Sequence, residues 1–314
     1  MAAATIGCRN IQELRDSQHP WQSKLGVSYQ QIMKLTALEL SCRSSRLSYC
    51  LQLFTERLGY SVVGSSRKSG VHVLQLKNTW FVFRPNDVQE RVEYVSELVF
   101  HVENVEKMYA SARANGGKIV EALSSFHCEC GVCNVFTVQS PFPSITHTFT
   151  NCPAYSLHHF AATEPEAFSS LSDCDNSASD WKTLLMQDVD CIDHVTFVSD
   201  QGESRERVSW YQRVLGFKRF HLHSSETSDG YSINCDTNGL KMLALEYYKC
   251  AEVCVSLEGV KLVFGEGLPG PGTRSCGTQT SPVCRADCSL VWKAVHCTMP
   301  LLHCAIILHY CMVE

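Results

Sequence analysis

The chain has 314 residues, of which 45% are hydrophobic and 19% are charged, and its formal net charge is −5. This length is sufficient for two domains with a sizeable core. The acidic balance, with a pI of about 6.2, and the lack of a basic stripe argue against a nucleic-acid partner.

Eighteen cysteines are scattered along the chain, and no secretory signal stands at its start. This usage predicts a reducing compartment and free thiols rather than a disulfide framework. The N-terminal extension, residues 1–32, mixes Arg9 and Arg15 with Glu13 and Asp16. Mitochondrial transit peptides are rich in Arg and poor in acidic residues, so targeting stays open between mitochondrion and cytoplasm.

A strand, a helix and three further strands are predicted first. Lys34–Leu40 alternates as a strand does. Residues 43–58 carry apolar side chains at helical spacing, with Ser44 or Ser45 as N-cap and Gly59 directly after the last apolar position. The shorter strands that follow are expected at residues 61–64, 71–76 and 80–84.

The same succession is predicted twice more. Tyr94–Val102 begins the second copy, and a helix over residues 106–115 ends at Gly116. Cys191–Val198 begins the third copy, whose helix ends at Leu215 with Gly216 as a left-handed C′ residue. The remaining strands are expected at 119–122, 132–139 and 145–150 in the second copy, and at 217–223, 232–235, 241–246 and 260–265 in the third.

Internal repetition is therefore the main architectural signal. The fold class predicted is α+β, with tandem βαβββ modules that are paired in an N-terminal domain and incomplete in a C-terminal one. Two such modules bury their sheets by packing side by side. The predicted organisation is an N-terminal extension (1–32), a two-module domain (33–158), a linker rich in Ser, Asp, Ala and Glu (159–188), a third module (189–272) and a divergent tail (273–314).

The third copy carries a run of residues that resembles a known family. Ile192-Asp193-His194, Trp210-Tyr211, Leu215-Gly216-Phe217 and Arg219-Phe220 are similar to the first metal-binding module of the 4-hydroxyphenylpyruvate dioxygenase family, and closest to its dioxygenase-like branch. That family belongs to the vicinal oxygen chelate superfamily. Glyoxalases and extradiol oxygenases also place a His on a first strand, but the context of this run favours them less.

The resemblance implies chemistry as well as fold. In the family, the histidine matching His194 is a ligand of Fe(II), which two His and one carboxylate hold with open positions for substrate. The implied substrates are an aromatic 2-oxo acid of aromatic amino acid metabolism and O₂. Oxidative decarboxylation with hydroxylation would then give homogentisate or 4-hydroxymandelate. A mitochondrial location follows from the resemblance alone. In the second copy, Glu97 takes the place that matches His194.

The tail departs from the family pattern. Where the family continues with a strand that carries a second iron His, and later a Glu, residues 273–314 contain six cysteines and two acids, Asp287 and Glu314. Neither of the other two ligands has a matching position. We therefore also consider a non-catalytic, truncated relative, in which an unpaired third module exposes a sheet edge that favours partner binding or a homo-oligomer.

Two further features bear on binding. The apolar stretch 301–313 is shorter than the roughly 20 residues that cross a bilayer, so no membrane span is predicted. His127-Cys128-x-Cys130-x-x-Cys133 has the spacing of soft metal ligands. A zinc site would need His127 as its fourth ligand. The simpler interpretation, which we favour, is a hairpin whose thiols alternate between its faces.

Overall fold

The structure is a computed structural model that describes residues 33–87, 94–171, 192, 194–221, 225–234, 239–247 and 260–268. The chain divides into two units, Met1–Gln30 and Gln31–Glu314. Every described residue belongs to the second unit. The predictions made for residues 1–32 and 273–314 lie outside the described residues.

The first set of elements forms a βαβββ arrangement. Its first strand, β1, runs parallel to its last, β4, so that Ala37 lies opposite Trp80. The connection between them begins with a helix, α2, which continues into a π-helical turn, η2, and supplies the crossover that a parallel pair requires before β2 and β3 lead to β4. The bounds are β1 Met33–Cys42, α2 Ser44–Gln52, η2 Leu53–Arg57, β2 Ser61–Ser66, β3 His72–Leu76 and β4 Thr79–Pro85.

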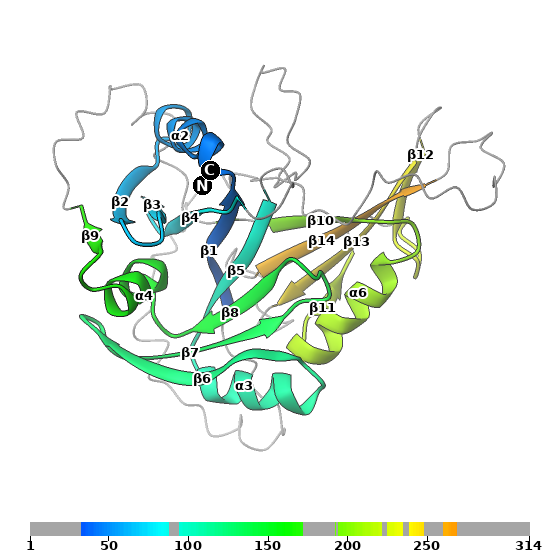
Figure 1. Ribbon diagram of the computed structural model, residues 1–314. Coiled ribbons are helices and arrows are strands. Elements are labelled where there is room, and N and C mark those ends of the chain that lie inside the picture. Colours follow the sequence, from blue (N-terminus) through cyan, green and yellow to red (C-terminus); the bar gives the residue numbers. More distant parts are fainter. Residues whose placement is uncertain are drawn as a thin grey trace, which may run out of the picture. The chain divides into compact units, whose positions relative to one another are not determined.

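The second set has the same order of elements, and β5 runs parallel to β8. An antiparallel pair between β1 and β5, with Leu38 opposite Leu98, joins the two sets into one nine-stranded sheet of order β6-β7-β8-β5-β1-β4-β3-β2-β9 (Figure 1). The bounds are β5 Tyr94–Val102, α3 Val105–Ala114, β6 Ile119–Cys128, β7 Gly131–Gln139 and β8 Thr146–Thr150.

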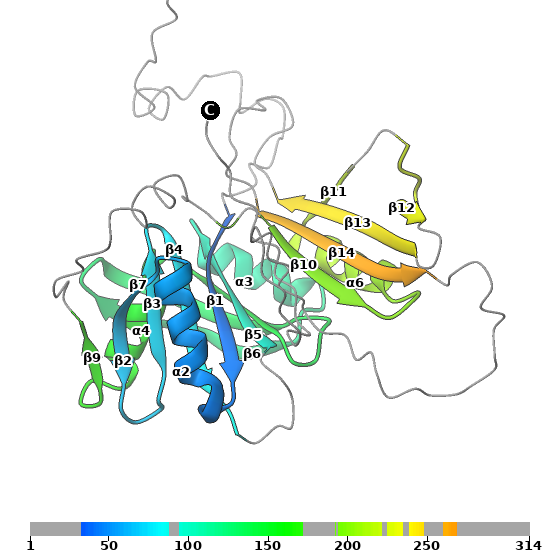
Figure 2. The ribbon, with the colours of Figure 1, turned by 90° about the horizontal axis from the view of Figure 1, so that it is seen from above.

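The third set forms a second, five-stranded sheet. Its order is β10-β14-β13-β11, with β12 paired to β13, and the helix α6 covers one face of it (Figure 2). Again the first strand, β10, runs parallel to the last, β14. The bounds are β10 His194–Ser199, α6 Ser204–Trp210, η3 Tyr211–Leu215, β11 Lys218–Phe220, β12 Tyr231–Asn234, β13 Gly239–Tyr247 and β14 Val260–Leu268. The predicted fold class, α+β with βαβββ modules, is confirmed.

The helix ends follow local chemistry. Gly216 closes the third helix with φ of 78°, the left-handed conformation predicted for it. The N-cap prediction for the first helix was wrong. Arg43 holds the cap position, and Ser44 is the first helical residue, because the Asp87 carboxylate accepts hydrogen bonds from the Ser44 amide (2.8 Å) and hydroxyl (2.6 Å). The N-terminal amide of this helix is thus satisfied by Asp87, which lies 43 residues away, and not by the side chain of a neighbouring serine.

The first part of the segment predicted as a linker has regular structure. Helix α4 spans Tyr155–Thr163, and strand β9 spans Phe168–Ser170. β9 pairs with β2 at the edge of the nine-stranded sheet, with Gly64 opposite Ser170. A Cβ added at Gly64 would lie 2.4 Å from the Phe168 ring, so a side chain there would collide with the β9 segment. The polar composition hid this edge strand, because one short strand offers little periodicity.

The third set shares a core with the second. The ring of Phe142, in the loop between β7 and β8, stacks on Phe197 of β10 at 4.6 Å between centroids. Nε2 of His147 and the Tyr211 hydroxyl are 2.7 Å apart, and both side chains are fully buried. His147 Nδ1 lies 2.9 Å from the Thr146 carbonyl and donates to it, so Nε2 accepts the tyrosine proton. Burial lowers the pKa of His147 to about 3, which keeps the ring neutral.

No helix among the described residues is long and apolar enough to span a bilayer.

Replacing Tyr211 with Phe is expected to lower the free energy of unfolding by about 1–2 kcal/mol, because it leaves the buried His147 nitrogen without its donor. Urea denaturation of the two proteins measures the difference. Tyr109→Phe is the control, because the Tyr109 ring packs on Phe136 but its side chain is only partly buried. Equal losses in both variants would contradict a special role for the Tyr211 hydroxyl.

Candidate functional site

The candidate iron ligand predicted from the sequence, His194, is the first residue of β10 and is partly buried. On this strand Phe197 faces the helix, since its ring centroid lies 5.9 Å from that of Tyr211 in η3. Side chains of a strand alternate between faces. His194 and Thr196 therefore lie on the face of the sheet opposite α6, and Val195 lies on the helix side with Phe197.

A row of charged side chains crosses this open face beside His194. The strand register places His194 opposite Lys261, Lys261 opposite Glu246, and Glu246 opposite Lys218. Directly opposite residues share a face and contact one another. Glu246 is thus the nearest acidic side chain in this row, two strands away from His194, or about 9.5 Å across the sheet. Lys261 occupies the position between them in the row.

These residues do not by themselves fit an iron site. Fe(II) of the two-His, one-carboxylate type needs three converging ligands. Within the described ranges, one group of at least three His, Cys, Asp or Glu side chains has converging ligand atoms, and it consists of four cysteines without His194. The positive charge of Lys261 next to His194 also disfavours the binding of a divalent cation there. Asp193, the middle residue of the predicted motif, lies outside the described residues.

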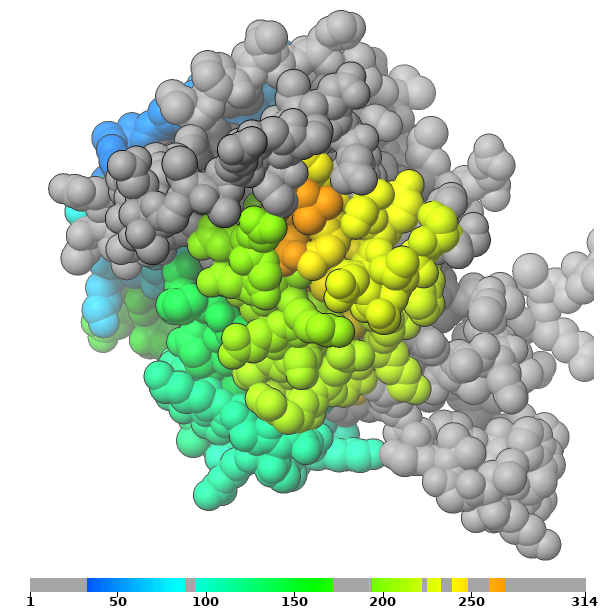
Figure 3. Space-filling model, turned by 90° about the vertical axis from the view of Figure 1, so that its right-hand side faces the viewer, coloured from blue at the N-terminus to red at the C-terminus, as the bar shows by residue number. Residues whose placement is uncertain are grey.

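A larger groove than the one described next lies on the other face of the same sheet. It is a groove of about 770 Å³ between α6 and strands β11 and β13. Figure 3 shows the side of the protein on which α6 and these strands meet. Arg205 and Glu206 line it from the helix, and Arg219 and Lys241 line it from the strands. Because Lys241 pairs with Glu266 of β14 on the helix side, this groove does not include His194.

A second cavity, of about 230 Å³, lies over the nine-stranded sheet beneath α4. A two-pronged ion pair occupies it, with Nε and Nη2 of Arg84 each 2.8 Å from a carboxylate oxygen of Glu39. Helix α4 contributes His159 and Phe160 to its wall. The sequence analysis missed this pair, although a lone Glu39 within an apolar strand was a signal that such a partner was needed.

Glu97, which matches His194 in the second set, lies in this polar cavity. Desolvation and the nearby charge of Glu39 raise the pKa of Glu97 to about 8. The Thr148 hydroxyl donates a hydrogen bond to the Glu97 carboxyl group and opposes that shift. The position that carries a candidate metal ligand in one sheet therefore carries a proton-retaining carboxyl in the other.

The geometry first defines a class. Parallel first and last strands, a crossover helix and an open sheet face make this a vicinal oxygen chelate fold. A triple mutant of 4-hydroxymandelate synthase from Streptomyces coelicolor has a similar structure, with a TM-score of 0.54, 14% identity and coverage of 76% of this chain and 63% of that one. A fusion of a xylose isomerase-like TIM barrel with 4-hydroxyphenylpyruvate dioxygenase gives 0.50 and 14%, over 82% of this chain and 35% of that one.

The sequence has a more particular relative. A 4-hydroxyphenylpyruvate dioxygenase from Dictyostelium discoideum is 24% identical over 185 residues, which are 55% of this chain and 48% of the relative. The chain thus spans about half the length of the curated relative it matches. No family model matches the chain. The resemblance drawn from the residues around His194 is confirmed by this relative and by the structural neighbours.

Glu97→Gln is expected to stabilise the protein at high pH. With its pKa raised from 4.5 to about 8, Glu97 keeps a proton in the folded state that the unfolded state releases, so stability falls as pH rises through this window. The glutamine removes this loss and still accepts from Thr148. Because the Glu97 side chain is only partly buried, we expect a gain of about 1–2 kcal/mol at pH 8.5 and little change at pH 4.5.

Thermal unfolding of both proteins across this pH range measures the effect. Glu106→Gln, a change at an exposed acidic residue of α3, is the matched control. A constant difference in stability at every pH would show that Glu97 does not titrate as described.

Proposed function

We propose that this protein is a non-haem iron dioxygenase of the 4-hydroxyphenylpyruvate type, with His194 as one iron ligand. Its substrates would be an aromatic 2-oxo acid and O₂. The observation that carries the proposal is the position of His194 at the start of the first strand of a βαβββ sheet, on the face that α6 leaves open. The relationship to a 4-hydroxyphenylpyruvate dioxygenase supports it. A mitochondrial location stays a prediction.

The sheet would position the ligand in a defined way. His194 has Lys261 as its neighbour on β14, and hydrogen bonds on both sides of β14 fix the position of that strand. An imidazole at this place is held by backbone pairing rather than by a loop, which favours a metal ligand of fixed orientation. The described residues supply this ligand and not the other two, so no catalytic step is derived from them.

A second candidate function is a non-catalytic relative that binds a partner through the third set of strands. The observation that favours it is the charged row of Lys261, Glu246 and Lys218 beside His194. Such a row is typical of a solvated or interaction surface. The row places Lys261 next to His194, where a metal centre would favour a carboxylate side chain.

Oxygen consumption separates the two functions. The full chain, supplied with Fe(II) and 4-hydroxyphenylpyruvate, is expected to take up O₂ in proportion to the keto acid. His194→Ala is expected to reduce this uptake at least about 100-fold, since removing a metal ligand costs more than removing its supporting group. His221→Ala is the control, because His221 is an exposed histidine at the end of β11 in the same sheet.

The outcomes are distinct. Uptake that is lost in the His194 variant and kept in the His221 variant supports the dioxygenase. If metal analysis shows that the wild-type chain has bound iron and it still consumes no O₂, the dioxygenase is excluded and the non-catalytic function is supported. Equal uptake by wild type and His194→Ala would overturn the assignment of the ligand.

A further inference from the structure

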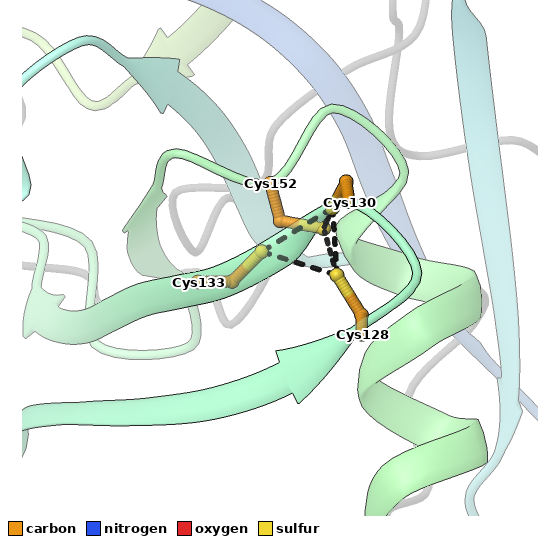
Figure 4. Close-up of side chains that lie close together, drawn as sticks. All are labelled: Cys128, Cys130, Cys133 and Cys152. Carbon is orange, nitrogen blue, oxygen red and sulfur yellow. Dashed lines mark hydrogen bonds between the residues drawn. The ribbon is translucent and has the colours of Figure 1, made fainter.

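Three thiols of the β6–β7 hairpin and a fourth from the segment after β8 meet at one end of the nine-stranded sheet. Cys128 ends β6, Cys130 lies in the following turn, Cys133 lies on β7, and Cys152 follows β8 (Figure 4). All four are free thiols. Their sulfur atoms lie within 4.8 Å of one another. The two interpretations of this hairpin in the sequence analysis were both incomplete, because neither included Cys152.

Strand register explains the convergence. In the β6–β7 hairpin Phe126 lies opposite Cys133, so Cys133 shares a face with Phe126 and with Cys128 two residues further on. The prediction that the thiols alternate between faces was therefore wrong. His127 points to the opposite face and is exposed, so it is not the fourth ligand. The turn uses Gly131, whose φ of 108° favours glycine.

The fourth thiol comes from the next strand. β7 pairs with β8 so that Val135 lies opposite Thr150, and continuing that register brings Cys152 level with Cys133. Asn134 donates its backbone amide to the Asn151 side chain at 2.7 Å, which fixes the chain between them. Cys133 and Cys152 are 2% and 0% exposed, whereas Cys130 is exposed. The cluster is thus dry on one side and open to solvent on the other.

Three of the sulfur–sulfur separations, 3.4, 3.7 and 4.0 Å, suit a single soft metal ion, and its binding would move Cys128 away from Cys130 and Cys133. Five sulfur–sulfur separations run from 2.6 Å (Cys128 to Cys130) to 4.0 Å (Cys128 to Cys152). Around a tetrahedral zinc with Zn–S bonds of about 2.3 Å, the sulfurs lie about 3.8 Å apart. A cluster of several irons would spread its thiolates more widely. Four thiolates with no other donor select Zn²⁺ among the common divalent ions.

We propose that Cys128, Cys130, Cys133 and Cys152 form a structural Zn²⁺ site, separate from the His194 face. The site would tie the β6–β7 hairpin to the segment that leads into α4, which begins at Tyr155. Helix α4 lines the cavity that holds Glu39 and Arg84. The zinc therefore fixes the helix that closes this cavity, and its loss would loosen α4 first. The exposed Cys130 gives the ion its path of entry.

Metal analysis of the full chain, purified under reducing conditions, tests the site. Because the chain has eighteen cysteines, the measured quantity is the difference between variants. Cys130→Ser is expected to hold one zinc fewer per chain than the wild type and to bind zinc more than about 100-fold more weakly. Cys152→Ala should lose the same ion. Cys50→Ser, a change in α2 outside the cluster, should keep it.

Two further readouts identify the ligands and the role. Co²⁺ in place of zinc should give the thiolate charge-transfer band and the strong visible bands of tetrahedral sulfur coordination, and Cys130→Ser should lose them. Hydrogen exchange should show α4 less protected after zinc removal, with β1 and β5 unchanged. Equal zinc content in wild type and Cys130→Ser would overturn the proposal. So would disulfides among the four cysteines in the reduced preparation. Cys130 is exposed, so this variant is expected to fold.

Discussion

Pairing of the first strand with the last in each βαβββ set is the constraint on which the structure depends. β1 with β4, β5 with β8 and β10 with β14 each run parallel, which obliges a helix to cross over one face of each sheet. The other face is left for side chains of the strands. A single antiparallel pair, β1 with β5, then fuses two sets into one nine-stranded sheet. The side chains on the open face of each sheet therefore determine what that face can bind.

The two sheets use their open faces differently. Over the nine-stranded sheet, α4 covers a small cavity in which Arg84 neutralises Glu39 and Glu97 keeps a proton. Buried charges are tolerated there because they are paired and hydrogen-bonded. Over the five-stranded sheet, the described residues present His194 beside a lysine and no covering helix. One face is closed by the chain itself, and the other is the candidate binding surface.

The four-cysteine cluster links these features. It lies where the β6–β7 hairpin meets the entrance to α4, so it acts on the helix that closes the Glu39–Arg84 cavity. The soft, neutral or anionic sulfurs pack against an apolar surface that would not stabilise harder ligands. A metal at this point would replace the hydrophobic packing that a short hairpin tip cannot supply.

The order of strands and helices within the three βαβββ sets, the glycine at position 216 and the motif around His194 were determined by the sequence alone, because they rest on periodicity and on contacts between near neighbours. Only the tertiary structure decided three other features: the cap that Asp87 gives to Ser44, the Glu39–Arg84 pair, and Cys152 as the fourth thiol. In each case the partners come from different elements or loops of the chain, 19 to 45 residues apart. The pairing of strands brings the ion pair and the fourth thiol together, and the periodicity of one strand does not tell which residue of a distant strand lies opposite.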